Sequence, residues 1–596
     1  MEPSDFYNKQ IQIFESDLKK LRQRKSSLGW LRFGSIAAII VAFYVLWSLS
    51  VWYVIIATTV LLTIFIRLLF ADLANKEAIN HVNHLININK NELKFLNGNY
   101  HDFPEGNQYG SAEHLYSNDL DIFGRASLFQ YINRSASEMG DTCLATYLKY
   151  PASLELIQKR QVAIKELSEK TQWRQHLQAL GMEKQILFST KKRLDKWVQE
   201  APVFSLFKPW GWLRYILPMT ILSVVTLYIF DLVSSGVFYL SLLIFAVLAY
   251  QINKLIAPIH EKLSKMADEL DVLYGSILHI ESGAFESRLL HELQKNFIYQ
   301  NKQASGEIRH IKKILDKLDL RYNLVISAPL NILLLWNLQQ VLDLEEWKEG
   351  HQKNINNWFE TLGEAEALSS FATLYFNEPG WIFPSIVQGY FFIEGKEIGH
   401  PLLLKNKRVN NDIELTHEGA LMLVTGSNMA GKSTYLRSIG INVVLTMAGA
   451  PVCAKTFKAS HVQIISSMRI TDNLEESTST FYAELKKLKT IIEKVNNGEK
   501  VFILLDEILR GTNSLDRHTG SVALMKQLIK YNAAAIIATH DLELAKLKDS
   551  FPENIINYHF DVQVSNDELF FDYRLKPGVC TSLNASILMK KIGIEL

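Results

Sequence analysis

Between an apolar run at 421–425 and a helical segment, the chain carries the loop Gly426-Ser427-Asn428-Met429-Ala430-Gly431-Lys432-Ser433-Thr434. The loop fits the pattern G-x-x-x-x-G-K-S, with a strand expected before it and a helix expected to open at Thr434. Its glycines let backbone N–H groups wrap around phosphates, and the helix N-terminus adds its dipole. Lys432 is expected to reach the β- and γ-phosphates, and Ser433 to ligate Mg²⁺. The pattern predicts a site for ATP and Mg²⁺, since a non-functional glycine turn seldom has these flanks.

A second apolar run, at 501–505, ends in the carboxylates Asp506 and Glu507. Asp506 is placed to hold Mg²⁺ through water, and Glu507 to orient or deprotonate an attacking water. Such a strand end is common by itself, but together with the loop it predicts nucleotide hydrolysis. His540 follows the apolar run 534–539, where a side chain can report on the γ-phosphate. In isolation, His540 would be interpreted as a structural loop histidine.

Length and composition indicate several domains with membrane segments. The chain has 596 residues, too many for one hydrophobic core, and its mean hydropathy of +0.03 is high for a purely soluble protein. The net charge of +1 gives no global basic field that would favour nucleic acid. The three cysteines, widely spaced, suggest neither a disulfide framework nor a zinc site.

Residues 33–66 contain no charged side chain, which is long for one membrane span and slightly short for two. We expect a tight helical hairpin that turns near residues 48–50. Basic residues flank both ends and none lies at the turn, which places both ends in the cytoplasm. A single steep helix is the alternative, but it would export the basic N-terminus.

A second apolar block, residues 215–252, is interrupted only by Asp231 and predicts another hairpin with both ends inside. The sequence therefore predicts four spans, a multi-pass protein of the cell (inner) membrane, and cytoplasmic termini. The apolar run 324–338 is too short to span and predicts a buried helix. Residues 258–374 have the helical periodicity of long packed helices.

After Pro379, short β-rich runs alternate with helical segments, which is typical of a mostly parallel sheet with crossover helices. The predicted fold class is thus a C-terminal α/β P-loop ATPase preceded by a helical core and membrane hairpins. The expected division is an N-terminal region 1–117 with a hairpin at about 31–70, a helical lever region 118–378 with a hairpin at about 213–253, and an ATPase domain 379–596.

Several motifs together resemble the MutS family of DNA mismatch repair ATPases. The segment 425–440, T-G-S-N-M-A-G-K-S-T-Y-L-R-S-I-G, is similar to the family's phosphate loop. Before it, Gly399-His400-Pro401-Leu402-Leu403 resembles the family's strand motif. Further similarities cover Ser479-Thr480-Phe481 with Glu484, Asp506-Glu507-Ile508 with Arg510-Gly511-Thr512 and Asp516, and Ala538-Thr539-His540. Upstream, segments at 139–161 and 364–371 resemble parts of the family's lever region.

The resemblance implies a dimer with composite ATP sites, in which Ser479 contacts the γ-phosphate of the partner's ATP. From spacing alone, Ser479 could equally be a helix N-cap. A homodimer is the simplest case. The chain lacks the family's large mismatch-reading domain, and the hairpin at 215–252 occupies the comparable part of the levers where the family inserts its DNA clamp.

Two functions follow from these patterns. The first is a membrane-anchored, MutS-like ATPase that binds mismatched or branched DNA in a repair or recombination role. The second is a membrane mechanochemical switch or scaffold that uses the dimer ATPase cycle on a protein or lipid partner. A basic cluster at 309–317 could contact phosphates, although charged helix faces are usually only solvated.

Overall fold

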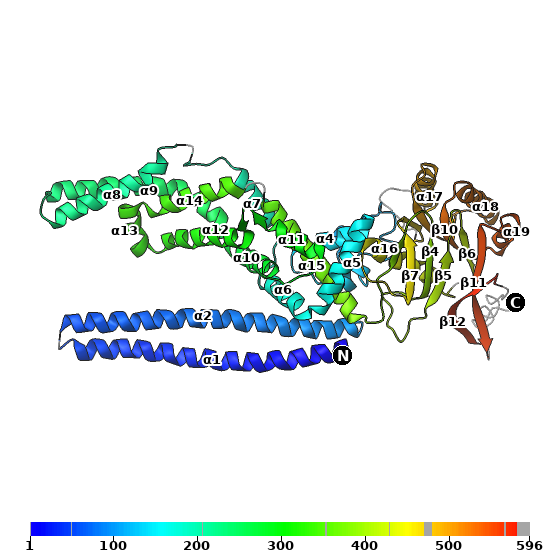
Figure 1. Cartoon of the computed structure of the whole chain (residues 1–596), viewed down its shortest axis with the longest axis horizontal. Helices are drawn as coiled ribbons and strands as arrows, with labels where there is room; N and C mark the ends of the chain where they lie inside the picture. Colours follow the sequence, from blue (N-terminus) through cyan, green and yellow to red (C-terminus); the bar gives the residue numbers. More distant parts are fainter. Residues whose placement is uncertain are drawn as a thin grey trace.

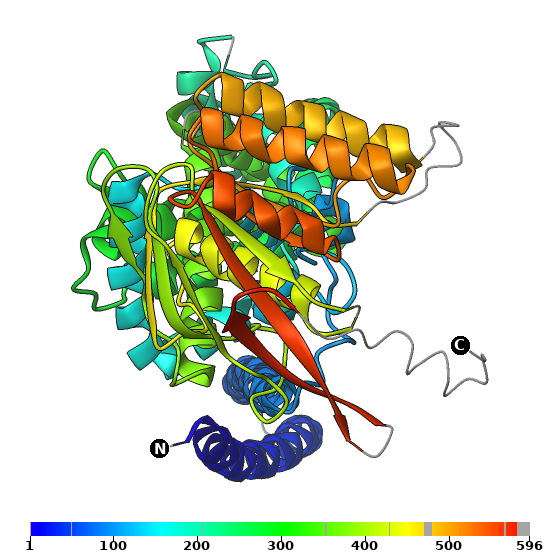
Figure 2. The ribbon, with the colours of Figure 1, turned by 90° about the vertical axis from the view of Figure 1, so that its right-hand side faces the viewer.

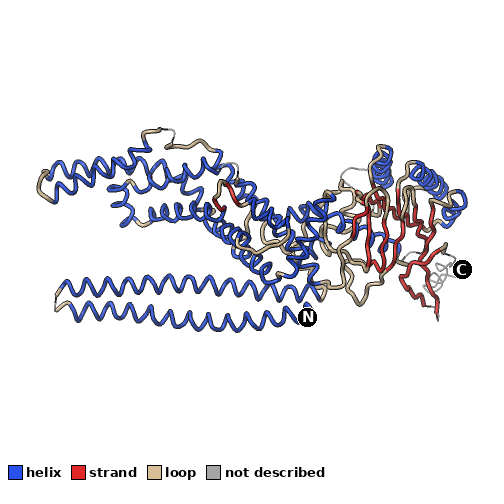
Figure 3. The backbone as a smooth tube through the Cα atoms, in the orientation of Figure 1, coloured by secondary structure: helices blue, strands red, loops and turns tan. Residues whose placement is uncertain are grey.

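The computed structural model describes residues 2–48, 50–205, 207–351, 354–427, 429–469, 480–565 and 568–580. The molecule is elongated, with strands gathered at one end and helices extending to the other (Figures 1 and 3). This arrangement agrees with the prediction of a helical region followed by an α/β region.

The chain begins with two long helices, α1 (Pro3–Leu46) and α2 (Val51–Leu96), which pack side by side as a hairpin (Figure 1). The break falls at the predicted turn, where the Ser50 side chain accepts a hydrogen bond from the backbone of Trp52 and caps α2. Both helices continue well beyond the uncharged segment, so that the half of the hairpin nearer the sheets carries charged residues. The half nearer the turn is uncharged, and most of its side chains are at least partly exposed, with Ser35 and Val54 as buried exceptions.

Thirteen further helices and one small hairpin complete the helical part. They are α3 (Leu128–Ile132), α4 (Glu138–Lys149), α5 (Leu154–Glu169), α6 (Thr171–Glu183), α7 (Phe188–Gln199), α8 (Trp210–Ile229), α9 (Ser235–Ser264), α10 (Ala267–Glu281), α11 (Arg288–Asn296), β1 (Ile298–Tyr299), β2 (Lys302–Gln303), α12 (Ala304–Asp319), α13 (Leu324–Leu334), α14 (Trp336–His351) and α15 (Ile355–Asn377). Helices α8 and α9 form the second predicted hairpin. In the part of the chain that the structure describes, four helices are long and apolar enough to cross a membrane: α1, α2, α8 and α9.

The prediction of one buried helix over 324–338 is wrong. The chain breaks at Leu335, whose φ of 49° lies in the left-handed region, and α13 meets α14 at an angle of 74°. No described side chain of α13 is buried, whereas most of α14 is. The uncharged composition of the segment gave no signal for this break.

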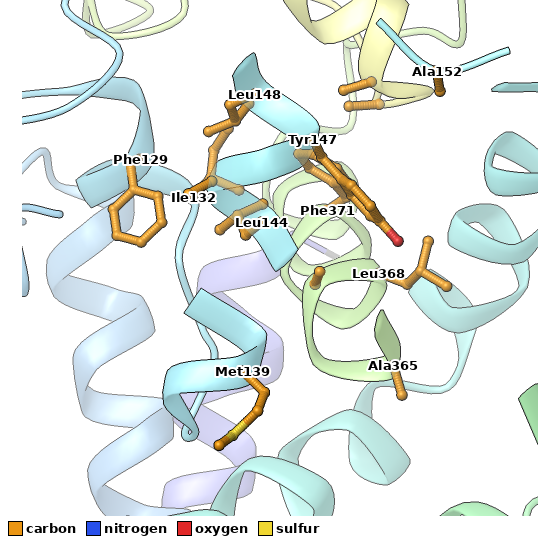
Figure 4. Packing of buried hydrophobic residues seen from close by; sticks show 14 of the residues in the cluster. Phe129, Ile132, Met139, Leu144, Tyr147, Leu148, Ala152, Ala365, Leu368 and Phe371 are labelled. Atoms are coloured by element: carbon orange, nitrogen blue, oxygen red, sulfur yellow. The ribbon is translucent and has the colours of Figure 1, made fainter. Parts of the chain in front are cut away.

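Helix α15 forms the centre of the helical core. Seventeen of its residues are buried, and it packs against α4 and α5. Figure 4 shows Phe371 of α15 beside Tyr147 of α4, and the two rings stack with their centroids 6.3 Å apart.

A buried carboxyl group joins α15 to the beginning of α4. Glu366 accepts hydrogen bonds from the side chain and backbone of Ser137, at 2.5 and 3.2 Å, and Ser137 is the N-cap of α4. Burial raises the pKa of Glu366 to about 7, although the hydrogen bonds from Ser137 oppose that rise.

The α1–α2 hairpin is attached to this core by a buried polar network. Arg134 pairs with Glu92 of α2 at 2.5 Å, and both side chains are less than a tenth exposed. The second Glu92 oxygen accepts from Asn377 at the end of α15 (2.8 Å), whose amide oxygen accepts from the hydroxyl of Tyr7 in α1 (2.6 Å). One network therefore holds both hairpin helices against the last turn of α15.

The α/β part contains two sheets, and several neighbouring strands in them are distant from each other in the sequence. The six-stranded sheet has the order β12-β11-β6-β10-β9-β8, all parallel except β12 at the edge, and the four-stranded sheet has the order β3-β7-β4-β5. The strands are β3 (Ser385–Val387), β4 (Ile393–Ile398), β5 (Asn411–Leu415), β6 (Leu421–Thr425), β7 (Thr456–Ser460), β8 (Gln463–Ser467), β9 (Val501–Asp506), β10 (Ala534–Thr539), β11 (Ile555–Ser565) and β12 (Glu568–Pro577).

Alternate residues of the central strands divide the core of the larger sheet between two faces. Side chains such as Met422 and Leu504 share a cluster with α16 (Lys432–Ala448) and with the helical region. Their neighbours Leu423 and Leu505 pack on α17 (Thr480–Asn496) and α18 (Ser514–Lys530), which lie together on the other face (Figure 2). The short helix α19 (Leu547–Ser550) precedes β11. The face with α16 thus joins the sheet to the helical region in one continuous core.

We expect Arg134→Met to lower the free energy of unfolding by about 3–5 kcal/mol, because it leaves the buried Glu92 carboxylate without its partner. Denaturant titration of the detergent-solubilised chain measures this change. Lys90→Met is the matched control, since Lys90 and Glu15 also join α2 to α1 but are both about half exposed. That surface pair should contribute less than about 1 kcal/mol. Equal effects of the two substitutions would contradict a structural role for the buried pair.

Candidate functional site

The predicted phosphate loop connects β6 to α16. Gly426 has a φ of 145°, and a Cβ at this position would come within 2.8 Å of the backbone oxygen of Phe560. Gly431, with a φ of 110°, is the N-cap of α16, which begins at Lys432, two residues before the predicted start at Thr434. Both glycines therefore occupy backbone conformations that other residues rarely adopt.

One predicted motif near the loop has a different structure, and two predicted site residues are not described. The motif Gly399–Leu403 is not a strand: β4 ends at Ile398, and the motif forms the turn that follows. Its Gly399 oxygen accepts from the side chain of Asn442 in α16 (3.0 Å), which anchors that turn to the helix. Asn428 and Ser479 lie outside the described residues.

Lys432 is buried beneath the loop. Its ammonium group donates to the backbone oxygens of Gly426 and Ser427, at 2.7 and 2.9 Å. Burial lowers the pKa of Lys432, while the nearby carboxylates of Glu507 and Asp506 oppose that shift. The loop thus encloses a positive charge at the place where phosphate oxygens are expected.

The strand register brings the predicted carboxylates to the same sheet edge as the loop. Strand β10 lies between β6 and β9, and it pairs Thr539 with Thr425 on one side and Ala538 with Asp506 on the other. Ligands of open parallel sheets bind at the carboxyl ends of the strands. The loop, Asp506 and the residues after Thr539 therefore converge on the edge where a ligand is expected.

Glu507 begins the turn after β9 and has two partners there. One of its oxygens lies 3.2 Å from Nε of Arg510, and the other lies 3.6 Å from Nδ1 of His540. Arg510 also lies 3.6 Å from the carboxylate of Asp506. His540 is therefore close enough to Glu507 to influence its position, whereas its contact with the γ-phosphate stays a prediction.

Glu484 of α17 fixes the turn that carries these groups. Its buried carboxylate accepts from the backbone N–H groups of Leu509 and Arg510, at 2.5 and 3.1 Å. Burial raises the pKa of Glu484, and the two backbone hydrogen bonds oppose the rise. Motif similarity pointed to Glu484 and Arg510, but only the structure assigns them to one turn.

A cavity of about 360 Å³ lies over the loop, a size typical of small-molecule sites. Seven predicted site residues line it: Ser427, Met429, Gly431, Lys432, Ser433, Thr434 and Glu507. Four others do not: Gly426, Ala430, Asp506 and His540. Local sequence gave no signal for three further lining residues, Val409, Phe560 and Tyr573, of which Phe560 and Tyr573 lie against the glycines of the loop.

The donors near the loop fit Mg²⁺. Ser433 lines the cavity and Asp506 ends β9 at the same edge of the sheet, and Mg²⁺ prefers hydroxyl and carboxylate oxygen ligands. Among the described residues, no group of three or more His, Cys, Asp or Glu side chains forms a protein-only metal site.

Residues 422–590 match the family model for MutS domain V, which is a P-loop ATPase domain. The chain is also similar to the DNA mismatch repair protein MutS of Aquifex pyrophilus, with 33% identity over 38% of the chain and 26% of that protein. Mouse MutS protein homolog 4 is 34% identical over 32% of the chain and 20% of the homolog, and Ehrlichia chaffeensis MutS is 30% identical over 55% and 40%. These matches show that the C-terminal part of the chain is similar to proteins of the MutS family and support a place in that family. It spans between a fifth and two fifths of the length of these relatives.

We expect Lys432→Ala to reduce phosphate release from ATP at least about a hundredfold, because a preorganised charge aimed at the phosphates is lost. Phosphate release by the solubilised chain measures the effect. Lys458→Ala is the control, because Lys458 is half exposed on β7 and pairs with Glu394 away from the cavity. Unchanged turnover in Lys432→Ala would contradict the assignment of the loop.

Proposed function

We propose that this protein is a membrane-anchored, Mg²⁺-dependent ATPase whose nucleotide state controls DNA binding by its helical levers. The observation that carries the ATPase assignment is the shared cavity of Lys432, Ser433 and Glu507 over the loop between β6 and α16. Members of the MutS family are ATPases, which supports hydrolysis by this site.

The proposed roles follow from chemistry and position. The amides of residues 426–434 bind the phosphates, Lys432 neutralises the β- and γ-phosphates, and Ser433 with Asp506 holds Mg²⁺. The metal polarises the γ-phosphate and offsets its charge. Tyr573 lines the cavity beside Gly431 and is 44% exposed, so its ring offers aromatic surface on which a nucleobase can stack.

Glu507 is the proposed base or positioning group for the attacking water, and His540 couples it to the γ-phosphate. In the structure the Glu507 carboxylate is shared between Arg510 and His540. To reach a water in line with the γ-phosphate, it must exchange at least one of these contacts. Because Glu484 fixes the backbone of Arg510, motion of α17 is transmitted to this exchange.

The membrane anchor is proposed from the two apolar hairpins. The apolar halves of α1–α2 and α8–α9 are exposed, and their turns point to the same end of the molecule, away from the sheets (Figure 1). With basic residues at the open ends of both hairpins, the proposed location is the cell (inner) membrane, with the ATPase part and both termini cytoplasmic. The division into regions 1–117, 118–378 and 379–596 belongs to this proposal.

MutS homologues function as dimers, and we propose a homodimer in which each ATP is bound between two subunits. In this arrangement Ser479 of one subunit contacts the γ-phosphate held by the other, and Asn428 contributes to the loop of its own subunit. ATP binding then closes the two ATPase domains together, and hydrolysis releases them.

DNA is the first candidate for the partner that the lever helices bind, because the similar proteins are named for DNA mismatch repair. A protein or lipid partner is the second candidate, and one observation favours it. The α8–α9 hairpin, inserted within the lever region, exposes apolar rather than basic side chains. The basic cluster at 309–317 is also partly neutralised, since Lys312 pairs with Asp271. The two proposed functions use the same ATPase site and differ in the partner that the lever helices bind.

We expect Glu507→Gln to keep ATP binding but slow hydrolysis by about 10²–10⁴-fold, because the amide cannot act as a base while Asp506 still holds the metal. Binding of a fluorescent ATP analogue and phosphate release separate the two effects. Glu543→Gln is the control, since Glu543 is exposed and pairs only with Lys546 in the described contacts. Rapid hydrolysis by Glu507→Gln would remove Glu507 from its proposed role.

Measuring DNA binding by the full chain in detergent decides between DNA and a protein or lipid as the bound partner. Homoduplex, mismatched and branched DNA are titrated with and without ATP over a series of salt concentrations. The first candidate predicts affinity that falls with salt and changes with ATP, because phosphate contacts release counterions. Absence of binding at low salt, with hydrolysis intact, would reject DNA and leave the protein or lipid load.

A further inference from the structure

The α13 helix combines the composition of a membrane segment with a length that cannot cross one. No charged side chain occurs from residue 322 to 342, but this run is divided at Leu335 into α13 and α14. The 11 residues of α13 extend only about 16 Å, roughly half of a bilayer's hydrocarbon core of about 30 Å. By itself the helix is too short to span the membrane and can lie in its interface, although α13 and α14 together are long and apolar enough for one bent span.

One face of α13 exposes apolar side chains. Val325 is 83% exposed and Ile326 44%, and Tyr322, just before the helix, is 71% exposed. Pro329 lies one turn further on the same face and is also exposed. Neighbouring α14 buries most of its side chains, so the exposure is specific to α13.

Several polar groups around α13 are paired inside the protein. The Asn331 side chain donates to the Ser327 oxygen (2.8 Å) and accepts from the backbone N–H of Asn337 (3.0 Å), which bridges the bend. The indole of Trp336 donates to the Lys317 oxygen at 3.0 Å. Internal pairing of this kind is what an apolar surrounding requires of a broken helix.

The position of α13 relates it to the proposed spans. It packs against both α8 and α9, whose exposed apolar surfaces continue from it. The 74° bend places α13 across the ends of α12 and α14, at the side of the helical core that faces the same way as the hairpin turns (Figure 1). A helix lying crosswise to two spanning hairpins lies parallel to the membrane plane.

Charged residues indicate the depth of α13. Lys317 and Arg321 immediately precede it, and Arg214 at the start of α8 pairs with Asp343 of α14 at 2.6 Å. Because Arg214 lies where α8 would enter the membrane, the charged part of α14 is held at the same level. The uncharged α13 therefore begins where the charged surface ends.

We propose that α13 is an interfacial helix, with its face of Tyr322, Val325, Ile326 and Pro329 inserted at the boundary between headgroups and hydrocarbon in the cytoplasmic leaflet. Apolar helix faces bind this boundary through their buried area, and adjacent basic residues attract anionic lipids. The inference rests on the proposed membrane anchor and extends it: the helical core is attached to the lipid surface in addition to its two hairpins. Movement of the levers would then be movement against the membrane.

Site-directed spin labelling of the full chain in vesicles of phosphatidylcholine and phosphatidylglycerol tests the proposal. Val325→Cys carries the label, and Ile326→Cys on the same face is the second variant. Lys313→Cys on the exposed side of α12 is the aqueous reference, while Leu240→Cys in α9 and Val60→Cys in α2 are the lipid references. The wild-type chain gives the background from its native cysteines. Collision with oxygen, which concentrates in lipid, is compared with collision with a water-soluble nickel complex.

The expected result is that the labels at 325 and 326 collide more with oxygen than with nickel, at a depth between position 313 and position 240. An aqueous signal at 325 and 326 with lipid signals at 240 and 60 would overturn the interfacial helix and leave the anchor intact. Labels at 325 and 326 shielded from both reagents would overturn it in favour of cover by protein. Aqueous signals at all of these positions would overturn the anchor together with the inference.

Discussion

The buried ion pair between Glu92 and Arg134 is the contact on which the arrangement of the molecule depends. It attaches the long α1–α2 hairpin to the core at one end only, near the sheets, so that the opposite end is free to enter a membrane. Tyr7 and Asn377 complete the network and tie it to the last turn of α15. Buried charges require such partners because an unpaired charge in the interior is costly. The hairpin is therefore held in a defined direction rather than linked as a flexible tether.

The nucleotide cavity and the helical region share one hydrophobic core. Helix α16 starts at the phosphate loop and is almost wholly buried between the sheet and α4 and α5. Gly440 packs so closely that a Cβ there would lie 2.8 Å from both Leu120 and Leu504. Protein interiors are close-packed and transmit displacement. A change at the phosphates would thus reach α4 and, through it, α15, whose last turn holds the hairpin.

The end of the molecule farthest from the sheets is distinguished by its exposed apolar side chains. The hairpin ends and α13 expose aliphatic and aromatic side chains, whereas most helices between them and the sheets bury theirs. Apolar surface of this extent on a soluble protein would favour association. In the proposed membrane anchor a bilayer covers this surface, and the partner bound by the levers, DNA or another molecule, then lies close to lipid.

The sequence by itself predicted the local chemistry: the phosphate loop, the paired carboxylates at the end of β9, the position of His540 and the two apolar hairpins. These depend on residue spacing within one strand, turn or helix, and local spacing is conserved when the chain folds. Only the tertiary structure decided that Phe560 and Tyr573 close the cavity, that Glu484 fixes the turn of Arg510, and that α13 is exposed. An apolar run has the same composition whether protein or lipid covers it, so its burial depends on segments distant in the chain, which local pattern cannot locate.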